Sequence, residues 1–200
     1  MIITNLLAVQ IRSGFFADDQ AAILAGAEHD GFTYVGTPST SGFSSIRQAG
    51  EAVSIMLVLD DGQIAYGDCA AVQYSGAGGR DPIFKAEHAI NEISQHLVPF
   101  FCGKEITNFR TLAKELETFL VDGNQLHTAI RYGISQALLD AVAKSRAISM
   151  AEVIQDEYQT GIEINSVPLF VQSGDDRYNN VDKMIMKFAC LLYTSPSPRD

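Results

Sequence analysis

The sequence has no tryptophan, three cysteines and an excess of acidic over basic residues. Cys69, Cys102 and Cys190 are odd in number and widely spaced, and no two form a CxxC pair. This pattern argues against a disulfide framework and against a zinc knuckle, so we expect reduced thiols. With 14 Lys and Arg against 24 Asp and Glu, the formal net charge is −10. The chain therefore lacks the clustered cations that a nucleic-acid partner requires.

Long apolar runs are also missing. Nowhere do about eighteen apolar residues follow one another, as a membrane-spanning helix requires. The N-terminus has no basic leader region, and Thr4, Asn5 and Gln10 interrupt its apolar stretch. These absences predict a cytoplasmic protein without a membrane partner. The hydrophobic fraction of 46% is nevertheless that of a folded globular chain.

The first part of the chain has the patterns of strands. Residues 2–11 are strand-like, and residues 52–59 form a strongly apolar run. The turn Asp60-Asp61-Gly62 joins this run to residues 63–67. Because an Asp-Gly pair tolerates the positive φ of a tight turn, it predicts a hairpin. We expect an antiparallel sheet of about three strands.

Helical patterns follow the strands. Asp81 and Pro82 predict an N-cap and a first-turn proline for a helix over residues 83–97. Thr107 predicts a cap for a second helix over residues 108–120.

Two further helices are predicted after residue 126. Ser149 and Glu152 have the spacing of a capping box before a short helix. Strands followed by helices predict an α+β fold class. The longer helix, over residues 127–144, has an apolar stripe of Ile130, Ile134, Ala137, Leu138, Ala141 and Val142.

After Gly161 the pattern begins again, with a strand predicted over residues 164–171 and a helix over residues 181–187. This is the order of a βα unit. The final stretch, CLLYTSPSPRD, continues neither pattern, because Ser-Pro-Ser-Pro cannot extend a helix. It is either a natural disordered tail or, in the interpretation that we prefer, foreign sequence that begins near Phe188.

A glycine-rich segment, DCAAVQYSGAGGRDP, covers residues 68–82. Its glycines do not have the spacing of a phosphate-binding P-loop, and the third glycine of the dinucleotide fingerprint is missing. We interpret the segment as a loop that closes over a neighbouring site, with Gln73 and Tyr74 as polar contacts. A purely structural glycine turn is the alternative.

A second polar segment, residues 14–36, contains the residue types that bind metal ions. Asp18 can instead serve as the N-cap of a short helical turn over residues 20–24. We favour a capped, solvated loop over a metal site. The candidate metal ligands are Asp18, Asp19, Glu28, His29 and Asp30.

The stretch VQSGDDRYNN places a polar tripeptide, Gln172-Ser173-Gly174, after the predicted strand. An Ala-Ser-Gly tripeptide can cyclise into an electrophilic group that drives ammonia elimination, but a bulky glutamine here replaces the alanine. In a βα unit the carboxyl end of a strand faces the active site. We therefore favour Gln172 as a substrate contact that offers both a donor and an acceptor.

Four runs resemble a known family: DCAAVQYSGAGGRDP, HTAIRYGISQALLDAVAKSR, MAEVIQDEY and EIN-VP-F-QSGDDRY-NVDKMI. They are similar to methylaspartate ammonia-lyases, members of the enolase superfamily, over residues 1 to about 187. The resemblance implies an N-terminal capping domain of antiparallel sheet and helices over residues 1–160. It also implies the first βα unit of a truncated (β/α)8 barrel over residues 161–188, and leaves residues 189–200 as a non-native tail.

The resemblance also implies an activity. Members of this family reversibly remove ammonia from 3-methylaspartate to give mesaconate in glutamate fermentation, and they are cytoplasmic homodimers that use Mg²⁺. The proton next to a carboxylate is weakly acidic, so a metal must stabilise the enolate while a base removes the proton. Gln172 matches the family glutamine at the end of the first barrel strand, and Gln73 matches the glutamine near the substrate amine.

The family's acidic metal ligands, lysine base and histidine lie beyond the region of resemblance, so no catalytic residue and no metal ligand is assigned to residues 1–200. We expect these residues to be the N-terminal part of a carbon-nitrogen lyase and to be inactive alone. A non-catalytic binding module built on the capping domain is the alternative. Reading the parent DNA beyond Lys187 distinguishes the two, because only a lyase continues into acidic ligands and a lysine.

Overall fold

The structure is a computed structural model that describes residues 1–71, 81–163, 165–166, 170–171, 177–187 and 190–191. The chain forms two compact units, Met1–Gly161 and Ile162–Asp200, and each is described by itself. In the part of the chain that the structure describes, no helix is long and apolar enough to cross a membrane.

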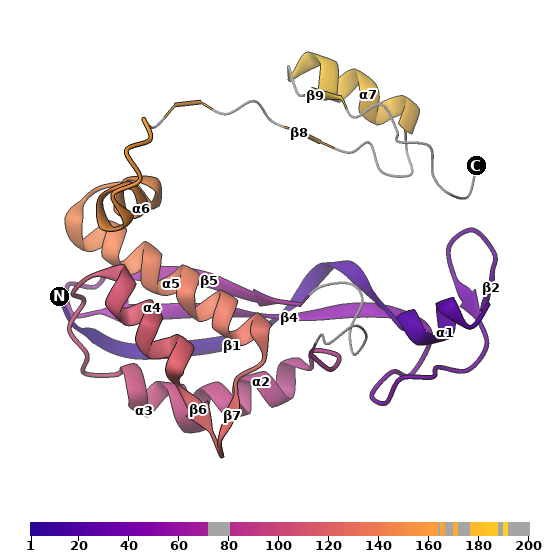
Figure 1. Cartoon of the computed structure of the whole chain (residues 1–200), viewed down its shortest axis with the longest axis horizontal. Helices are drawn as coiled ribbons and strands as arrows, with labels where there is room; N and C mark the ends of the chain where they lie inside the picture. The colour runs from indigo at the N-terminus through magenta and orange to yellow at the C-terminus, as the bar shows by residue number, and fades with distance from the viewer. Residues whose placement is uncertain (72–80, 164, 167–169, 172–176, 188–189, 192–200) are drawn as a thin grey trace. The chain divides into compact units, whose positions relative to one another are not determined.

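The first unit is built on a three-stranded antiparallel sheet with the strand order β1-β4-β5 (Figure 1). Strand β1 spans Ile3–Asp18, β4 spans Arg47–Leu59 and β5 spans Ile64–Ala70. The predicted hairpin between β4 and β5 is confirmed, and Gly62 in its turn has φ +86°. Both β1 and β4 are longer than the predicted strands.

The extra length of β1 and β4 forms a two-stranded arm beyond the end of β5. The pairing shifts register between Arg12 and Phe16 and then continues to Asp18, which pairs with Arg47. Irregular pairing of this kind bends a strand and increases its twist. The arm carries helix α1 (Gln20–Leu24) and the short strands β2 (Glu28–His29) and β3 (Tyr34–Val35).

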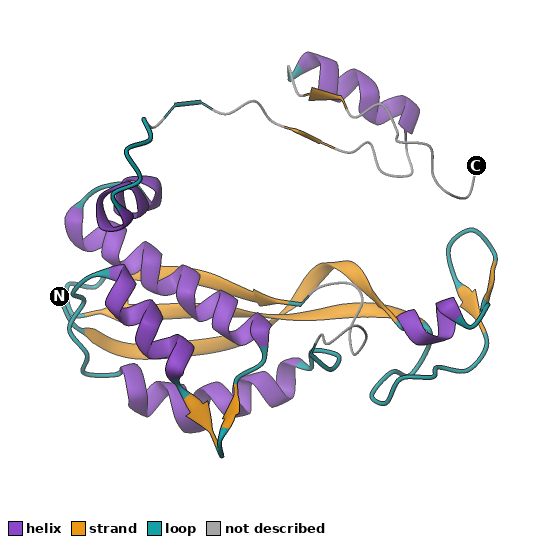
Figure 2. Ribbon diagram, in the orientation of Figure 1, coloured by secondary structure: helices purple, strands orange, loops and turns teal. Residues whose placement is uncertain are grey.

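Helices cover one face of this sheet (Figure 2). Helix α5 (Thr128–Arg146) packs on β5 and β4, whereas α2 (Ala86–Glu92), the π-helical turn η1 (Ile93–Leu97) and α3 (Val98–Phe101) pack on β1. The layers enclose an apolar core, and burial of its side chains stabilises the unit. Its largest fully buried side chains include Ile3, Val53, Ile55, Leu57, Ile93, Leu97, Phe101, Ile130, Ile134 and Leu138.

The remaining elements of the first unit are helix α4 (Phe109–Thr118), strands β6 (Leu120–Val121) and β7 (Asn124–Gln125), and helix α6 (Met150–Tyr158). The N-cap of α4 is Asn108, one residue after the predicted cap, and its side chain accepts from the backbone of Thr111.

Two helix predictions are confirmed, one in α6 and one in α5. The capping box of Ser149 and Glu152 is present at the start of α6. The predicted apolar stripe of α5 is buried: Ile130, Ile134, Ala137, Leu138, Ala141 and Val142.

The predicted start of the helix after Pro82 is wrong. Helix α2 begins at Ala86, and the side chain of Lys85 at its N-cap position makes no capping hydrogen bond. Instead the Ala86 amide donates to the carboxylate of Glu51 over 2.8 Å. Asp81 is engaged elsewhere, because its carboxylate accepts from the backbone of Thr128.

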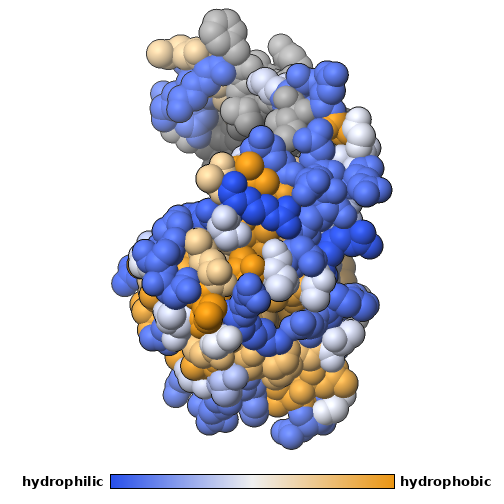
Figure 3. All heavy atoms as spheres, turned by 90° about the vertical axis from the view of Figure 1, so that its left-hand side faces the viewer, coloured by the Kyte–Doolittle hydropathy of each residue, from blue (hydrophilic) through white to orange (hydrophobic). Residues whose placement is uncertain are grey.

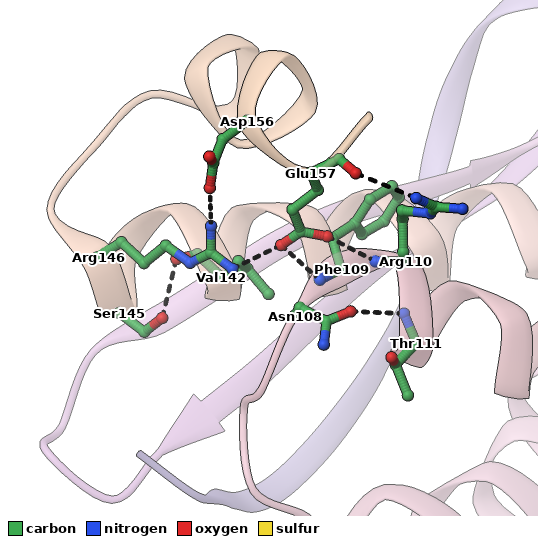
Figure 4. Close-up of polar contacts among 9 residues, drawn as sticks. All are labelled: Asn108, Phe109, Arg110, Thr111, Val142, Ser145, Arg146, Asp156 and Glu157. Atoms are coloured by element: carbon green, nitrogen blue, oxygen red, sulfur yellow. Dashed lines mark hydrogen bonds and ion pairs between the residues drawn. The ribbon is translucent and has the colours of Figure 1, made fainter. Parts of the chain in front are cut away.

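Glu157 joins three helices at the end of the first unit (Figure 4). Its carboxylate accepts from the amides of Phe109 and Arg110 at the start of α4, over 2.9 and 2.7 Å. Arg146, in the last turn of α5, donates to the same carboxylate over 2.7 Å. A carboxylate is favourable at a helix N-terminus because the amides there lack partners within the helix. Glu157 thus holds α6 against α4 and α5.

The sheet face away from the helices carries apolar side chains. Successive residues of a strand point to opposite faces, and Leu7 and Val9 are 42% and 48% exposed while Leu6 is buried. The space-filling view shows hydrophobic residues at the surface among hydrophilic ones (Figure 3).

In the second unit, β8 (Phe170–Val171) pairs with β9 (Cys190–Leu191) in parallel, and α7 (Arg177–Met186) lies between them in sequence. The described part of the predicted strand 164–171 is β8. Helix α7 begins four residues before its predicted start at residue 181 and ends at Met186. Parallel strands joined by a helix form a βαβ unit. Its place as the first unit of a barrel stays a prediction.

Candidate functional site

Helix α5 runs antiparallel to β5 and bonds to the backbone along its outer edge. The amide of Tyr66 donates to Asp140 over 2.8 Å, and the amide of Asp68 donates to Gln136 over 3.4 Å. Lys144 donates to the Ile64 carbonyl over 2.6 Å and also pairs with Asp140. Gln136, Asp140 and Lys144 are four residues apart, so they lie on one face of the helix.

Two glycines allow this close contact. A Cβ atom on Gly67 would lie 2.1 Å from the carbonyl oxygen of Gly133, and one on Gly133 would lie 2.7 Å from the amide nitrogen of Cys69. Burial, with a smaller effect from the nearby Asp68, raises the pKa of the Cys69 thiol to about 12. Cys69 is therefore a packing residue rather than a nucleophile.

The N-terminus of α5 is joined to the residues that follow position 80. The amide of Thr128 donates to the Asp81 carboxylate over 2.6 Å, and the His127 Nε2 lies 3.0 Å from the Pro82 carbonyl. The His127 Nδ1 accepts from the amide of Ala129 over 3.0 Å and caps the helix. Because an amide can only donate and a carbonyl can only accept, Nε2 carries the proton.

Asp81 is ionised in this arrangement. Burial opposes the charge, but the hydrogen bond from Thr128 holds the pKa of Asp81 below its usual value. An ionised acceptor makes a stronger hydrogen bond to an amide than a neutral one does.

Residues 83–86 are also held in place by contacts with other elements. Ile83 and Phe84 are buried, and the Phe84 ring meets the His127 ring edge-on at 5.2 Å between centroids. Glu51 accepts from the Ala86 amide and pairs with Lys85 over 3.2 Å. Residues 81–86 are thus fixed by α5 and by the base of the arm.

The residues predicted to contact substrate lie outside the described residues. Gln73, and Tyr74 with the glycines after it, belong to residues 72–80, and Gln172 with Ser173 and Gly174 belongs to residues 172–176. The structure describes the flanks of the first segment, Ala71 and Asp81, in detail. Both predicted contacts stay predictions.

The acidic residues of the arm are used in folding. Asp18 is fully buried and binds Arg47 through two hydrogen bonds of 2.8 Å each, so the predicted solvated loop is wrong at this residue. The cap of α1 is Asp19 rather than Asp18. Asp30 accepts from the amides of Phe32 and Thr33 in a turn. Among the residues that the structure describes, no three His, Cys, Asp or Glu side chains form a group that could hold a metal ion.

Asp19 holds the arm together as a buried carboxylate. It accepts from the amides of Ala21 and Ala22 in α1, and from the amides of Ser39 and Thr40 over 2.6 and 2.8 Å. The Thr40 hydroxyl also donates to this carboxylate, over 2.6 Å. Burial opposes the charge, but the hydrogen bonds, with the largest contribution from the Thr40 hydroxyl, lower the pKa of Asp19 below its usual value.

Replacing Asp19 with alanine is expected to destabilise the arm by about 2 kcal/mol, since it removes a cap and leaves amides without partners. Faster hydrogen exchange over residues 19–46 would report this loss, and Glu28→Ala, an exposed acid of the same arm, is the control. The wild-type arm should keep this stabilisation above about pH 4 and lose it as the pH falls through the lowered pKa. Equal exchange in Asp19→Ala and wild type would contradict the assignment.

A surface groove of about 960 Å³ lies beside α4 and α6. Its polar side chains already have partners in the protein: Glu157 binds the start of α4, and Lys114 pairs with Glu117. Arg110 lies over the Tyr158 ring, 5.2 Å from its centroid. This groove is therefore a weaker candidate for a functional site than the residues on either side of the segment 72–80, which are held by α5.

Comparison with known families identifies the family to which these residues belong. Residues 1–159 match the family model described as the methylaspartate ammonia-lyase N-terminus. The chain belongs to the methylaspartate ammonia-lyase family. The sequence-based assignment to this family is thereby confirmed.

Two relatives with curated names are methylaspartate ammonia-lyases. That of Clostridium tetanomorphum is 60% identical over 192 residues, which are 96% of this chain and 46% of the relative. That of Citrobacter amalonaticus is 55% identical over 175 residues, which are 88% of this chain and 42% of the relative. The chain thus spans less than half the length of these lyases.

Solved structures agree with this assignment. The Mg-complex of β-methylaspartase from Clostridium tetanomorphum matches with a TM-score of 0.88 and 60% identity, over 94% of this chain and 46% of that one. A muconate lactonizing enzyme from Pseudomonas fluorescens is 17% identical, with a TM-score of 0.58 over 92% of this chain and 42% of that one. This more distant likeness concerns the fold alone.

The sequence did not indicate the roles of His127, Asp81 and Gln136. The local pattern makes Asp81 the N-cap of the helix predicted over residues 83–97, and it places His127 and Gln136 in the helix predicted over residues 127–144 without a further role. The resemblance to lyases could have indicated the contact between residues 81–82 and the start of α5. The run of residues 68–82 ends at Asp81-Pro82, and the next run that resembles the family begins at His127.

Proposed function

We propose that this chain supplies the N-terminal region of a lyase that removes ammonia from 3-methylaspartate to give mesaconate. The match of residues 1–159 to the methylaspartate ammonia-lyase N-terminus carries this proposal. A structure of the Citrobacter amalonaticus lyase, which contains (2S,3S)-3-methylaspartic acid and has a TM-score of 0.86 to this chain, supports the choice of substrate.

In this proposal the chain binds and orients the substrate. Gln73 hydrogen-bonds to the substrate amine, and Gln172 offers its amide to a polar group of the same molecule. Neither glutamine can ionise, so neither removes the proton next to the carboxylate. That step is assigned to a base elsewhere in the full-length lyase.

The proposed cofactor is Mg²⁺, which is named in the structure of the Clostridium tetanomorphum lyase. It would stabilise the enolate that forms when the proton leaves. The described residues contain no group of acidic or histidine side chains that fits the ion. In this proposal its ligands lie outside these residues, and this chain acts only by binding and orienting the substrate. The full-length lyase is proposed to be a cytoplasmic homodimer.

Replacing Gln73 with alanine in the full-length lyase is expected to weaken ammonia addition to mesaconate and to admit larger amines. A lost hydrogen bond to a charged group costs about 1.5 to 3 kcal/mol, which is roughly a 10- to 100-fold loss in kcat/KM. Kinetics with ammonia and with methylamine measure both effects. Gln95→Ala, which changes an exposed glutamine on η1, is the control. Unchanged amine selectivity in Gln73→Ala would remove Gln73 from the site.

A further inference from the structure

The inside of the arm differs from the core of the first unit. The arm comprises residues 16–49, and it contains two fully buried carboxylates, Asp18 and Asp19. Among the described residues, Ala17 and Ile46 are also buried in the arm but do not belong to the apolar core between the sheet and the helices. Figure 1 places α1 and β2 beyond the ends of α5 and α2. The arm is therefore held together mainly by its own polar contacts.

We infer that the arm opens and closes as one unit, independently of the sheet, and that Arg47 is the lock that keeps it closed. The arm turns about a β-bulge at its base. This device does not depend on the proposed lyase reaction.

The β-bulge separates the arm from the rest of the sheet. Three residues of β1, from Ser13 to Phe15, lie opposite the single residue Gly50 of β4. A Cβ atom on Gly50 would lie 2.8 Å from the Phe15 carbonyl oxygen, so the two strands approach closely here. Extra residues of this kind interrupt the ladder of hydrogen bonds. An opening of the arm can therefore stop at the bulge and leave the pairing of Arg12 with Glu51 in place.

The Arg47 side chain ties four parts of the arm together. From β4 it binds the Asp18 carboxylate of β1 through two hydrogen bonds of 2.8 Å each. It donates to the Phe32 carbonyl, between β2 and β3, over 2.6 Å. Its guanidinium also lies over the rings of Phe16 in β1 and Tyr34 in β3, 5.8 and 4.9 Å from their centroids. Because a guanidinium can bind a carboxylate at two points and stack on aromatic rings, one residue fixes these parts at once.

Asp19 connects the other side of the arm to this lock. Its amide donates to the Ile46 carbonyl over 2.7 Å, directly before Arg47 in the sequence. Its carboxylate accepts from the amides of Ser39 and Thr40 and from the Thr40 hydroxyl. Since Asp18 and Asp19 are adjacent, a displacement of one moves the other. A loss of contact at Arg47 is therefore expected to spread to residues 39–46.

The closed arm also covers a residue outside it. A Cβ atom on Gly42 would lie 2.9 Å from the Ile83 side chain, and Ile83 is 9% exposed. Phe84, the next residue, belongs to the main core. Opening of the arm is therefore expected to uncover Ile83 and to leave Phe84 buried.

Hydrogen exchange distinguishes such a unit from the rest of the chain. Amides in a segment that opens locally exchange at a rate set by the free energy of that opening rather than of global unfolding. We therefore expect the amides of the arm to share one level of protection, below that of residues 53–59 in β4.

The variant Arg47→Leu in the 200-residue chain tests the lock. Leucine leaves the Asp18 carboxylate buried without its partner, which shifts an opening equilibrium by at least about 100-fold. We expect exchange in α1, at residues 28–35 and at residues 39–46 to rise by one common factor of this size. Exchange at residues 53–59 and in α5 should stay within about 2-fold of the wild type.

Arg12→Leu is the matched control. It makes the same chemical change at an exposed arginine of β1, directly before the bulge. It should leave exchange unchanged both in the arm and in the sheet.

A second variant, Thr40→Val, acts from the opposite side of the arm and keeps the size of the side chain. It removes the hydroxyl that donates to Asp19 over 2.6 Å. A lost hydrogen bond to a charged group corresponds to about a 10- to 100-fold change in an equilibrium. If the arm is one unit, exchange should rise by this factor at residues 28–35 as well as at residues 39–46.

Each other outcome contradicts a separate part of the inference. A rise limited to the neighbours of the substituted residue in both variants would overturn the single unit. An equal rise at residues 53–59 and in α5 would overturn its independence from the sheet. Wild-type arm amides that exchange as slowly as those of residues 53–59 would overturn the opening itself. Unchanged exchange in Arg47→Leu would remove Arg47 as the lock.

Discussion

Replacing Gly133 with alanine is expected to lower the free energy of unfolding of the first unit by about 2 kcal/mol. The added Cβ atom would lie 2.6 Å from the Cys69 sulfur, 2.7 Å from the Cys69 amide nitrogen and 2.8 Å from the Asp68 carbonyl carbon. Two of these atoms are backbone atoms of a strand paired with β4, so they cannot move independently. Overpacking of this kind costs about 3 kcal/mol, and the better helix propensity of alanine returns about 1 kcal/mol.

Urea denaturation of the 200-residue chain, followed by circular dichroism, measures this loss. Gly14→Ala is the matched control, because its new methyl group would meet nothing within 4 Å and its backbone does not have a positive φ. Its midpoint should stay close to that of the wild type. A Gly133→Ala midpoint equal to or above the wild-type value would show that α5 and β5 can move apart at little cost.

Residues 1–200 alone are expected to convert 3-methylaspartate to mesaconate at least about 10⁴-fold more slowly than a full-length lyase, because both the base and the metal site contribute large factors. Gln73 and Gln172 orient a substrate but cannot ionise. Ultraviolet detection of mesaconate with saturating Mg²⁺ measures the rate. The full-length Clostridium tetanomorphum lyase, 60% identical over the shared region, serves as the positive control.

Size-exclusion chromatography of the same sample should accompany the assay. Measurable turnover that coincides with a monodisperse peak of the 200-residue chain would mean that these residues contain a base and a complete site. In that case the assignment of Gln73 and Gln172 as the substrate contacts of an incomplete site would have to be abandoned.

Elements with a local signal could be predicted from the sequence. The buried stripe of α5 follows from apolar residues three and four positions apart, and the capping box of Ser149 and Glu152 is complete within four residues. The β4–β5 hairpin follows from one Asp-Gly pair between apolar runs. Each of these features depends on neighbours in sequence, so its pattern is visible without tertiary structure.

Features that depend on distant partners could not be predicted in this way. Asp81 and Pro82 have the local pattern of a helix start, but the Asp81 carboxylate binds Thr128, 47 residues away. Strand β1 continues past Ile11 because Arg47 and its neighbours extend β4 beside it. In both cases a tertiary contact replaced the structure that the local pattern favoured.

The candidate substrate contacts come from the resemblance to a known family rather than from a local pattern in the sequence. Glutamine is an ordinary polar residue, and nothing in the spacing of Gln73 and Gln172 indicates that they bind one molecule. The scaffold of the site was missed for another reason. The four-residue spacing of Gln136, Asp140 and Lys144 shows that they share a helix face, but it does not show that their partners are backbone groups of β5.

Gln136, Asp140 and Lys144 also determine whether a further strand can pair with β5 at the edge of this sheet. Strand β5 lies at one margin of the sheet, where exposed amides and carbonyls would normally recruit a further strand from another molecule. Here Asp140 and Gln136 already bind the amides of Tyr66 and Asp68, and Lys144 binds the carbonyl of Ile64. An incoming strand would have to displace a charged pair along a helix. Helix α5 therefore protects this margin against domain swapping and fibrillar assembly.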